Sequence, residues 1–137
     1  MPFAEQGYTK ADIRKKLMGA VACFSKNKLQ PGVHLLIDAV GMIEKTAGVS
    51  MVERPAHLSG LPDRVGAAEG SFRKAVINEL IGEAIGEVQS EYWAEAVWHL
   101  KDSAELARRI GESQNKTIKI EFTPDHMARH QVKESEV

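Results

Sequence analysis

The sequence contains little cysteine, few aromatic residues and no long apolar run. Of the 137 residues, one is cysteine and 6% are aromatic. A single cysteine, Cys23, cannot form an internal bridge, which excludes a disulfide scaffold and favours a reducing compartment. No run reaches the roughly 18 consecutive apolar residues of a membrane-spanning helix, and the first residues lack the pattern of a signal peptide. We therefore expect a cytoplasmic protein with no membrane partner.

Length and hydrophobic content predict one folded domain. Hydrophobic residues make up 43% of the chain, and a chain near 150 residues buries roughly two-thirds of its unfolded surface. We predict a single helical domain over residues 1–114, with a long connection over 47–70. Residues 115–137 are predicted to form an extended or strand-like tail.

Charge is balanced overall and uneven along the chain. The net charge of −1 gives no general basic excess for nucleic-acid binding. However, Lys10 to Lys28 holds six bases against Asp12, and residues 78–107 hold seven acids against Lys101. This pattern favours antiparallel neighbouring helices of opposite charge. The alternatives are a two-signed surface for partners, or a nucleic-acid contact made by Arg14, Lys15 and Lys16.

The first half of the chain predicts a helical hairpin. Thr9 and Asp12 form a capping-box pattern ahead of apolar residues at helical spacing, which indicates a helix over 10–26. Pro31 suits the first turn of a second helix that ends near Gly48. The short link between the two helices requires them to run antiparallel.

The second half predicts another hairpin after the Gly/Pro-rich connection. Ser71 is the expected N-cap of a third helix, and Ser90 that of a fourth helix ending near Ile110. One continuous helix from 71 to 110 is the alternative, but 40 residues would be unusually long. Gly82 and Gly86 each cost helix stability, so we expect another helix backbone to approach them closely.

The segment after the fourth helix alternates apolar and charged residues. This period of two over residues 117–122 predicts a strand, for which the same chain offers no partner. The segment would pair with a second subunit, add to a partner's sheet, or form an extended arm. Its apolar residues are candidate partner contacts: Ile118, Ile120 and Phe122.

The two hairpins resemble tetratricopeptide repeats in the spacing of small and large residues. The first hairpin shows this spacing from Gly19 to Glu44, and the second from Trp93 to Ser103; the matching residues are Ala20, Cys23, Phe24, Gly32, Leu36, Ala39, Trp93, Ala96, Leu100 and Ser103. The long connection and the lack of a proline after Glu44 depart from the repeat. The resemblance implies a binding module with a concave face for peptides or proteins and no catalysis. The predicted fold class is therefore all-α: two antiparallel helical hairpins with four main helices, as a bundle or a repeat pair, and a short C-terminal strand as an option.

Catalytic patterns are mostly missing, so no catalytic residue and no cofactor is predicted. Phosphate-binding loops, zinc cysteine pairs and the His-Glu-x-x-His pattern do not occur. Two weak fragments remain. His126 and His130 are spaced to share a helix face and hold a metal. The triplet Glu91, Glu95 and His99 has helical spacing and is more typical of an exposed face.

Three functional hypotheses follow from these patterns. The first is a non-catalytic protein-protein interaction module or assembly subunit that binds another protein or a second copy of itself. Its candidate contacts include Trp98, which lies off the main apolar stripe, and His57, which lies in the connection. The second is a nucleic-acid-associated subunit that uses the basic first helix. The third is a metal-binding helical enzyme built on the histidines.

Overall fold

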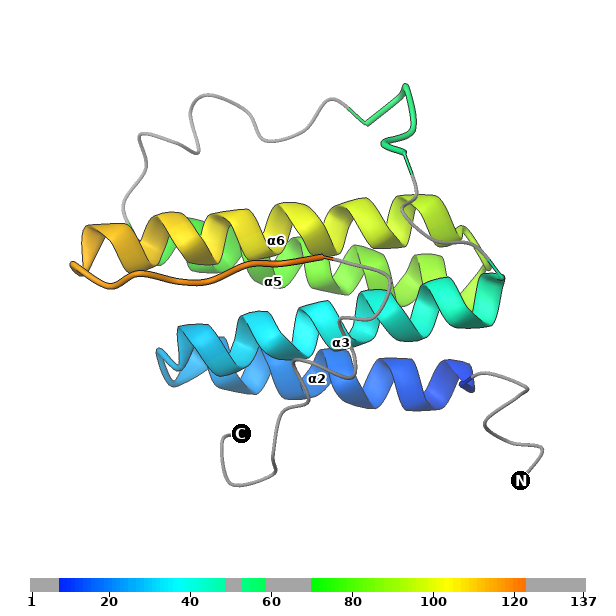
Figure 1. Cartoon of the computed structure of the whole chain (residues 1–137), viewed down its shortest axis with the longest axis horizontal. Coiled ribbons are helices and arrows are strands. Elements are labelled where there is room, and N and C mark those ends of the chain that lie inside the picture. The colour runs from blue at the N-terminus through cyan, green and yellow to red at the C-terminus, as the bar shows by residue number, and fades with distance from the viewer. Residues whose placement is uncertain (1–7, 49–52, 59–69, 123–137) are drawn as a thin grey trace.

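The protein is an all-α bundle of two helical hairpins, as predicted from the sequence. The computed structural model describes residues 8–48, 53–58 and 70–122; for 70–73 only the backbone is described. Its helices are α2 (Lys10–Ser25), α3 (Leu29–Ala47), α5 (Gly70–Gln89) and α6 (Trp93–Ser113), shown in Figure 1. Within these residues the structure has no strand. Two separate helices over 70–113 confirm the preferred interpretation of that region.

Helix α2 begins at the predicted capping box. The Thr9 hydroxyl accepts a hydrogen bond from the Asp12 amide at 3.0 Å, and the Asp12 carboxylate accepts one from the Thr9 amide at 3.1 Å. Hydrogen bonding of the Asp12 carboxylate, first with the Thr9 amide and then with the Thr9 side chain, lowers the pKa of Asp12 below its usual value. The box satisfies two amide groups that the first helical turn leaves without partners.

Both hairpins turn through the same three-residue link. Asn27 and Glu91, the middle residues of the links, take left-handed conformations with φ of 59° and 63°. In each link the next residue donates its amide to a carbonyl five positions back: Lys28 to Cys23 and Tyr92 to Glu87, both at 2.8 Å. This is the Schellman arrangement that ends a helix.

Two predicted caps are wrong. Tyr92 and not Ser90 is the N-cap of α6, and it makes no side-chain capping bond. The three-residue link places Ser90 directly after α5, where its amide still bonds back to Gly86. Helix α5 begins at Gly70, so Ser71 already lies inside its first turn.

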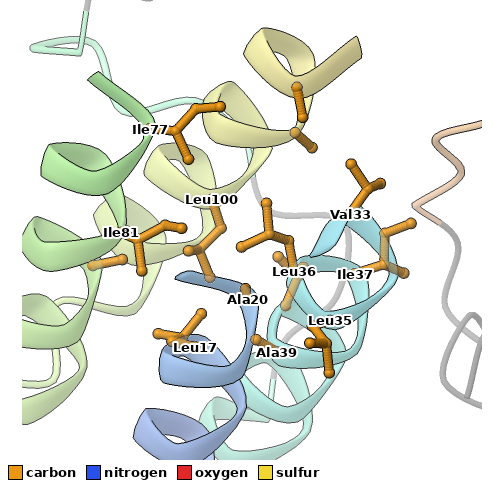
Figure 2. Close-up of a cluster of buried hydrophobic side chains, with 14 of the residues drawn as sticks. Leu17, Ala20, Val33, Leu35, Leu36, Ile37, Ala39, Ile77, Ile81 and Leu100 are labelled. Atoms are coloured by element: carbon orange, nitrogen blue, oxygen red, sulfur yellow. The ribbon is translucent and has the colours of Figure 1, made fainter. Parts of the chain in front are cut away.

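The core lies between the four helices (Figure 2). Helix α3 is buried over most of its surface, whereas the other helices bury one stripe each. The largest fully buried side chains are Ile13, Leu17, Phe24, Leu36, Ile37, Ile43, Ile77, Ile81, Leu100, Leu106 and Ile110. Cys23 is a free, buried thiol, and burial raises its pKa.

The two hairpins repeat the same buried pattern at an offset of 64 residues. Buried positions of the first hairpin recur in the second as Ile13 and Ile77, Leu17 and Ile81, Ala20 and Ala84, Phe24 and Val88, Leu36 and Leu100, and Asp38 and Asp102. The helix caps also repeat, since Lys28 has φ −89° and ψ 76° and Tyr92 has φ −86° and ψ 71°. The second hairpin is therefore a structural copy of the first.

Equivalent helices of the two hairpins pack against each other. Helix α2 contacts α5, and α3 contacts α6, in addition to the contacts within each hairpin. Both pairs run antiparallel in Figure 1, and the Lys10 ammonium near the start of α2 bonds the Gln89 carbonyl at the end of α5. Antiparallel packing of equivalent elements relates the hairpins by an approximate twofold axis.

The strand expected over 117–122 is absent. The segment is extended, but in the described structure it pairs with no other strand and lies on the helices instead. Ile118 is buried, and Ile120 and Phe122 pack against the core, while the residues between them are exposed. The alternation of apolar and charged residues therefore does separate a buried side of the segment from an exposed side. The buried side packs on helices, and no neighbouring strand is present among the described residues. Of the alternatives, the extended arm fits.

Candidate interaction site

The outward surfaces of α2 and α5 form one continuous face, because the two helices pack side by side. We call it the α2–α5 face and define it by Arg14, Lys15, Met18, Glu79, Gly82, Glu83 and Gly86, all of which are exposed. Met18 is 50% exposed, although it is a large apolar residue. A single exposed apolar side chain is common on protein surfaces, so Met18 bears on function only together with the glycines and charges of the same face.

The predicted close approach to Gly82 and Gly86 is wrong within this chain. Among the described residues, no neighbouring heavy atom lies within 4 Å of a Cβ placed at either glycine. Both residues point away from the partner helices because the buried stripe of α5 runs through Ile77, Ile81 and Ala84. The two glycines therefore lower the stability of helix α5, and no described residue packs on them to offset that loss.

Charge divides the α2–α5 face into two edges. Arg14 and Lys15 are exposed on α2, and neither forms an ion pair with another described residue. Lys16, the third predicted cation, turns toward buried Asp38 on α3 at 4.0 Å. The acidic edge on α5 consists of Glu79 and Glu83.

The predicted attraction between the oppositely charged segments is seen at one end of this face. The ammonium of Lys10 lies 2.9 Å from a carboxylate oxygen of Glu91. This pair joins the start of α2 to the link between α5 and α6. It is exposed, so we expect it to contribute little stability.

The triplet Glu91, Glu95 and His99 does not form one site. His99 Nδ1 lies 2.6 Å from Glu87, and its Nε2 lies 3.3 Å from Glu83, so both partners come from α5. Burial raises the pKa of Glu87, an effect that the hydrogen bond with His99 opposes. These contacts tie α5 to α6 near the acidic edge. In the described part of the chain, no group of three or more His, Cys, Asp or Glu side chains is arranged to hold a metal.

Trp98, the predicted partner contact, is half-buried and its ring is contacted from within the chain. The guanidinium carbon of Arg54 lies 4.5 Å from the ring centroid, and the ammonium of Lys101 lies 4.6 Å from it. Arg54 also makes two bonds, of 2.6 and 3.2 Å, to the buried carboxylate of Asp102. Through these contacts residues 53–58 are fastened to α6.

The remaining predicted residues are dispersed. His57 is 65% exposed and lies 3.4 Å from Glu95. His126 and His130 lie outside the described residues. Ile118, Ile120 and Phe122 pack on the helices, far from the α2–α5 face, on the side where α3 and α6 meet.

Sequence reasoning missed the residues that fasten the two extended segments. The Gln30 side chain binds the backbone of Lys119, and Asp102 binds Arg54. The buried acids could have been predicted from the sequence, because Asp38 and Asp102 interrupt apolar helix stripes at equivalent positions. A glutamine near a helix start has no such signal.

Comparisons with known proteins add no relative. No family model, no curated protein and no solved structure matches this chain. No helix of the described residues has the length and apolar character needed to cross a membrane.

Proposed function

We propose that the protein is a non-catalytic interaction module that associates with a second copy of itself through the α2–α5 face. The observation that supports this is that α2 carries a half-exposed Met18 with exposed bases, while α5 beside it carries two glycines that no described residue covers and exposed acids. The buried free thiol of Cys23 is consistent with a cytoplasmic location, which is part of the proposal.

A second copy fits this face because its charge pattern is self-complementary. In a twofold dimer the same surface patch is used by both subunits. Rotation by half a turn places Arg14 and Lys15 of one copy opposite Glu79 and Glu83 of the other. Such complementarity sets the orientation and speeds the encounter more than it adds affinity.

The glycines fit the same arrangement. Each costs up to about 1 kcal/mol of helix stability relative to alanine. No described residue of the same chain packs on Gly82 or Gly86 to offset this cost. In the proposed dimer a helix of the second copy occupies that space and packs closely on the α5 backbone.

A charge-exchange experiment tests the dimer. One variant combines Arg14→Glu and Lys15→Glu, and the other is Glu79→Lys. Light scattering coupled to size exclusion should show a dimer for the unmodified chain and a lower mass for each variant alone. An equimolar mixture should regain dimer relative to either variant alone, because the introduced acids then face the introduced lysine and the native Arg14 and Lys15 face native acids. Lys45→Glu, an exposed reversal at the end of α3, is the matched control and should leave the mass unchanged. A monomer at all concentrations, or variants that dimerise normally, would contradict the proposal.

Nucleic-acid binding is a second candidate, and the exposed cations Arg14 and Lys15 favour it. The acidic edge beside them opposes it, because Glu79 and Glu83 repel phosphates. Each phosphate contact would add roughly 0.9 to the slope of log affinity against log salt. Anisotropy of a labelled duplex at 50 and 200 mM salt should show this slope, and Arg14→Ala with Lys15→Ala should reduce it. Salt-independent or unchanged binding would count against this candidate.

The third candidate, a metal-binding helical enzyme, depends on His126 and His130 and finds no support in the described residues. Elemental analysis of the purified chain tests it. A stoichiometric metal that is lost in a variant with His126→Ala and His130→Ala would favour it over the interaction module.

A further inference from the structure

Residues 116–122, here called the arm, fold back along the bundle directly after α6 (Figure 1). Asn115 takes a left-handed conformation with φ 59°, and the Lys116 amide donates to the Gly111 carbonyl at 2.8 Å. This Schellman turn reverses the chain at one residue. The arm then lies on the surface formed by α3 and α6, which we call the arm groove.

Gln30 of α3 holds the arm by its backbone. Its side-chain carbonyl accepts from the Lys119 amide at 2.8 Å, and its amide nitrogen donates to the Lys119 carbonyl at 2.9 Å. The amide nitrogen also lies 3.0 Å from the His34 ring, which helps to fix its orientation. One N–H donor and the carbonyl acceptor of the Gln30 side chain thus replace the neighbouring strand that an extended segment requires. This contact selects an extended backbone and is indifferent to the side chain at that position.

Gly111 of α6 makes room for the first apolar residue of the arm. A Cβ at Gly111 would lie 2.5 Å from Ile118 Cγ1 and 3.1 Å from its Cδ1, which is too close for two carbon atoms. The missing side chain is therefore the space that Ile118 fills, and Ile118 is only 7% exposed. This contact selects a large aliphatic residue one position before the backbone that Gln30 binds.

Lys101 and Trp98 line the far end of the arm groove. The Lys101 ammonium lies 5.3 Å from the Phe122 ring centroid and 4.6 Å from that of Trp98. A cation at this distance from an aromatic face is attracted to it. The arm groove therefore recognises an aliphatic residue, an extended backbone and an aromatic residue, in the order of Ile118, Lys119 and Phe122.

We propose that the arm groove also binds the arm of a second copy, so that two chains exchange arms. The Gln30 contact joins residues 89 positions apart in sequence, whereas Gly111 and Ile118 lie on either side of the turn at Asn115. These contacts can be made equally by an arm of the same chain or of another, and the turn at Asn115 directs the arm to the groove of its own chain. Docking within one chain dominates in dilute solution because of its high effective concentration, and exchange grows as the protein is concentrated. This mode uses the α3–α6 side and is independent of the α2–α5 face.

Full-length variants and a labelled peptide test the arm groove. Ile118→Asp should empty the groove, because a carboxylate does not enter the apolar space beside Gly111. A fluorescent peptide of residues 115–122 should bind this variant at least tenfold more tightly than the unmodified chain, whose own arm competes. Adding Gln30→Ala should weaken peptide binding at least tenfold. Ile118→Ala, a milder variant, replaces Ile118→Asp if circular dichroism shows that the latter is unfolded.

Mixing two variants tests the exchange itself. Gly111→Ala closes the groove and keeps the arm, whereas Ile118→Asp keeps the groove and spoils the arm. Energy transfer between dyes on the two variants should appear in the mixture, whereas a mixture of two labelled samples of Gly111→Ala, which has no open groove, should give none. Folded variants that give no transfer, or a scrambled peptide that binds as well as the true one, would overturn the proposal. Both variants also carry Arg14→Glu and Lys15→Glu, which remove the proposed α2–α5 dimer, so energy transfer reports arm exchange and its failure is distinguishable from a failure of that dimer.

Discussion

Gly32 of α3 lies directly against the ring of Phe24 of α2. A Cβ at Gly32 would lie 2.6 Å from Cε1 and 2.8 Å from Cζ of that ring, and both residues are buried. The two helices of the first hairpin therefore approach each other at a point where only glycine fits. Ala96 occupies the equivalent position in the second hairpin, facing the smaller Val88.

Gly32→Ala should therefore destabilise the protein, by about 1–3 kcal/mol, because the added methyl group overpacks the hairpin. Urea unfolding followed by circular dichroism measures the change. Phe24→Leu in the same chain should recover part of the loss by removing the ring atoms that clash. Equal stability of Gly32→Ala and the unmodified chain would show that the hairpin opens freely at this point.

Gly82→Ala and Gly86→Ala should have the opposite effect on stability. Each lies in open space on α5, so alanine should raise the free energy of unfolding by up to about 1 kcal/mol through helix propensity alone. The measurement is made on dilute protein. At high concentration the same variants should dimerise less if the glycines lie at the α2–α5 interface, and unchanged dimerisation would argue against their part in it.

Glu91 adopts a left-handed backbone conformation that is unfavourable for a residue with a Cβ. Its φ of 63° costs a residue with a Cβ roughly 1 kcal/mol or more, whereas glycine adopts it freely. We expect Glu91→Gly to be more stable than Glu91→Ala by about 1 kcal/mol in urea unfolding. Both variants lose the contact with Lys10, so the difference between their free energies of unfolding reports the backbone strain at position 91. The matched substitution Asn27→Gly should gain less, because asparagine tolerates this conformation.

Arg54 neutralises Asp102, which lies in the buried face of α6. Arg54→Met should cost about 1–3 kcal/mol, because it leaves the carboxylate with its main partner removed. Arg54→Met with Asp102→Leu should be closer to the unmodified chain, since no charge is then buried. Thermal unfolding measures both. Trp98 fluorescence should also change in Arg54→Met, because the guanidinium contacts its ring.

Glu105 makes part of the stability dependent on pH. Hydrogen bonds from Arg108, and then from Arg109, hold the pKa of Glu105 below its ordinary value of 4.5. A carboxyl whose pKa is lower in the folded state stabilises the protein above the unfolded pKa and loses this effect as pH falls through the folded one. Glu105→Gln should therefore be less stable at pH 7 by less than about 1 kcal/mol, given that the pair is partly exposed. The gap to the unmodified chain should close as unfolding is measured at successively lower pH below 4.5; a constant gap would refute the assignment.

Much of the fold followed from local patterns that the tertiary structure did not alter. The Thr9 and Asp12 cap, the link at Asn27 and the break near Ser90 all depend on residues within one turn of each other, and each was predicted to within a few positions. The exact cap at Tyr92 was not, because a link that ends with no side-chain bond leaves no mark in the sequence.

The candidate sites were predicted less well, because they depend on which helices become neighbours. Trp98 was predicted to contact a partner because it lies off the main apolar stripe of its helix. In the structure, Arg54, which is 44 positions away in the sequence, lies over its ring. The glycines of α5 were expected inside the bundle, and they lie on its outer face because the stripe through Ile77 and Ile81 turns the opposite face inward.

By itself, the sequence determined the helices, their pairing into hairpins and the alternation of Ile118, Ile120 and Phe122, because periodicity and caps act over a few residues. Only the tertiary structure decided that the second hairpin packs on the first about an approximate twofold axis, and that a helical surface with Gln30 receives the alternating segment. The physical reason is that a backbone group must be satisfied by whatever partner the packing brings near, and that partner is 89 residues away.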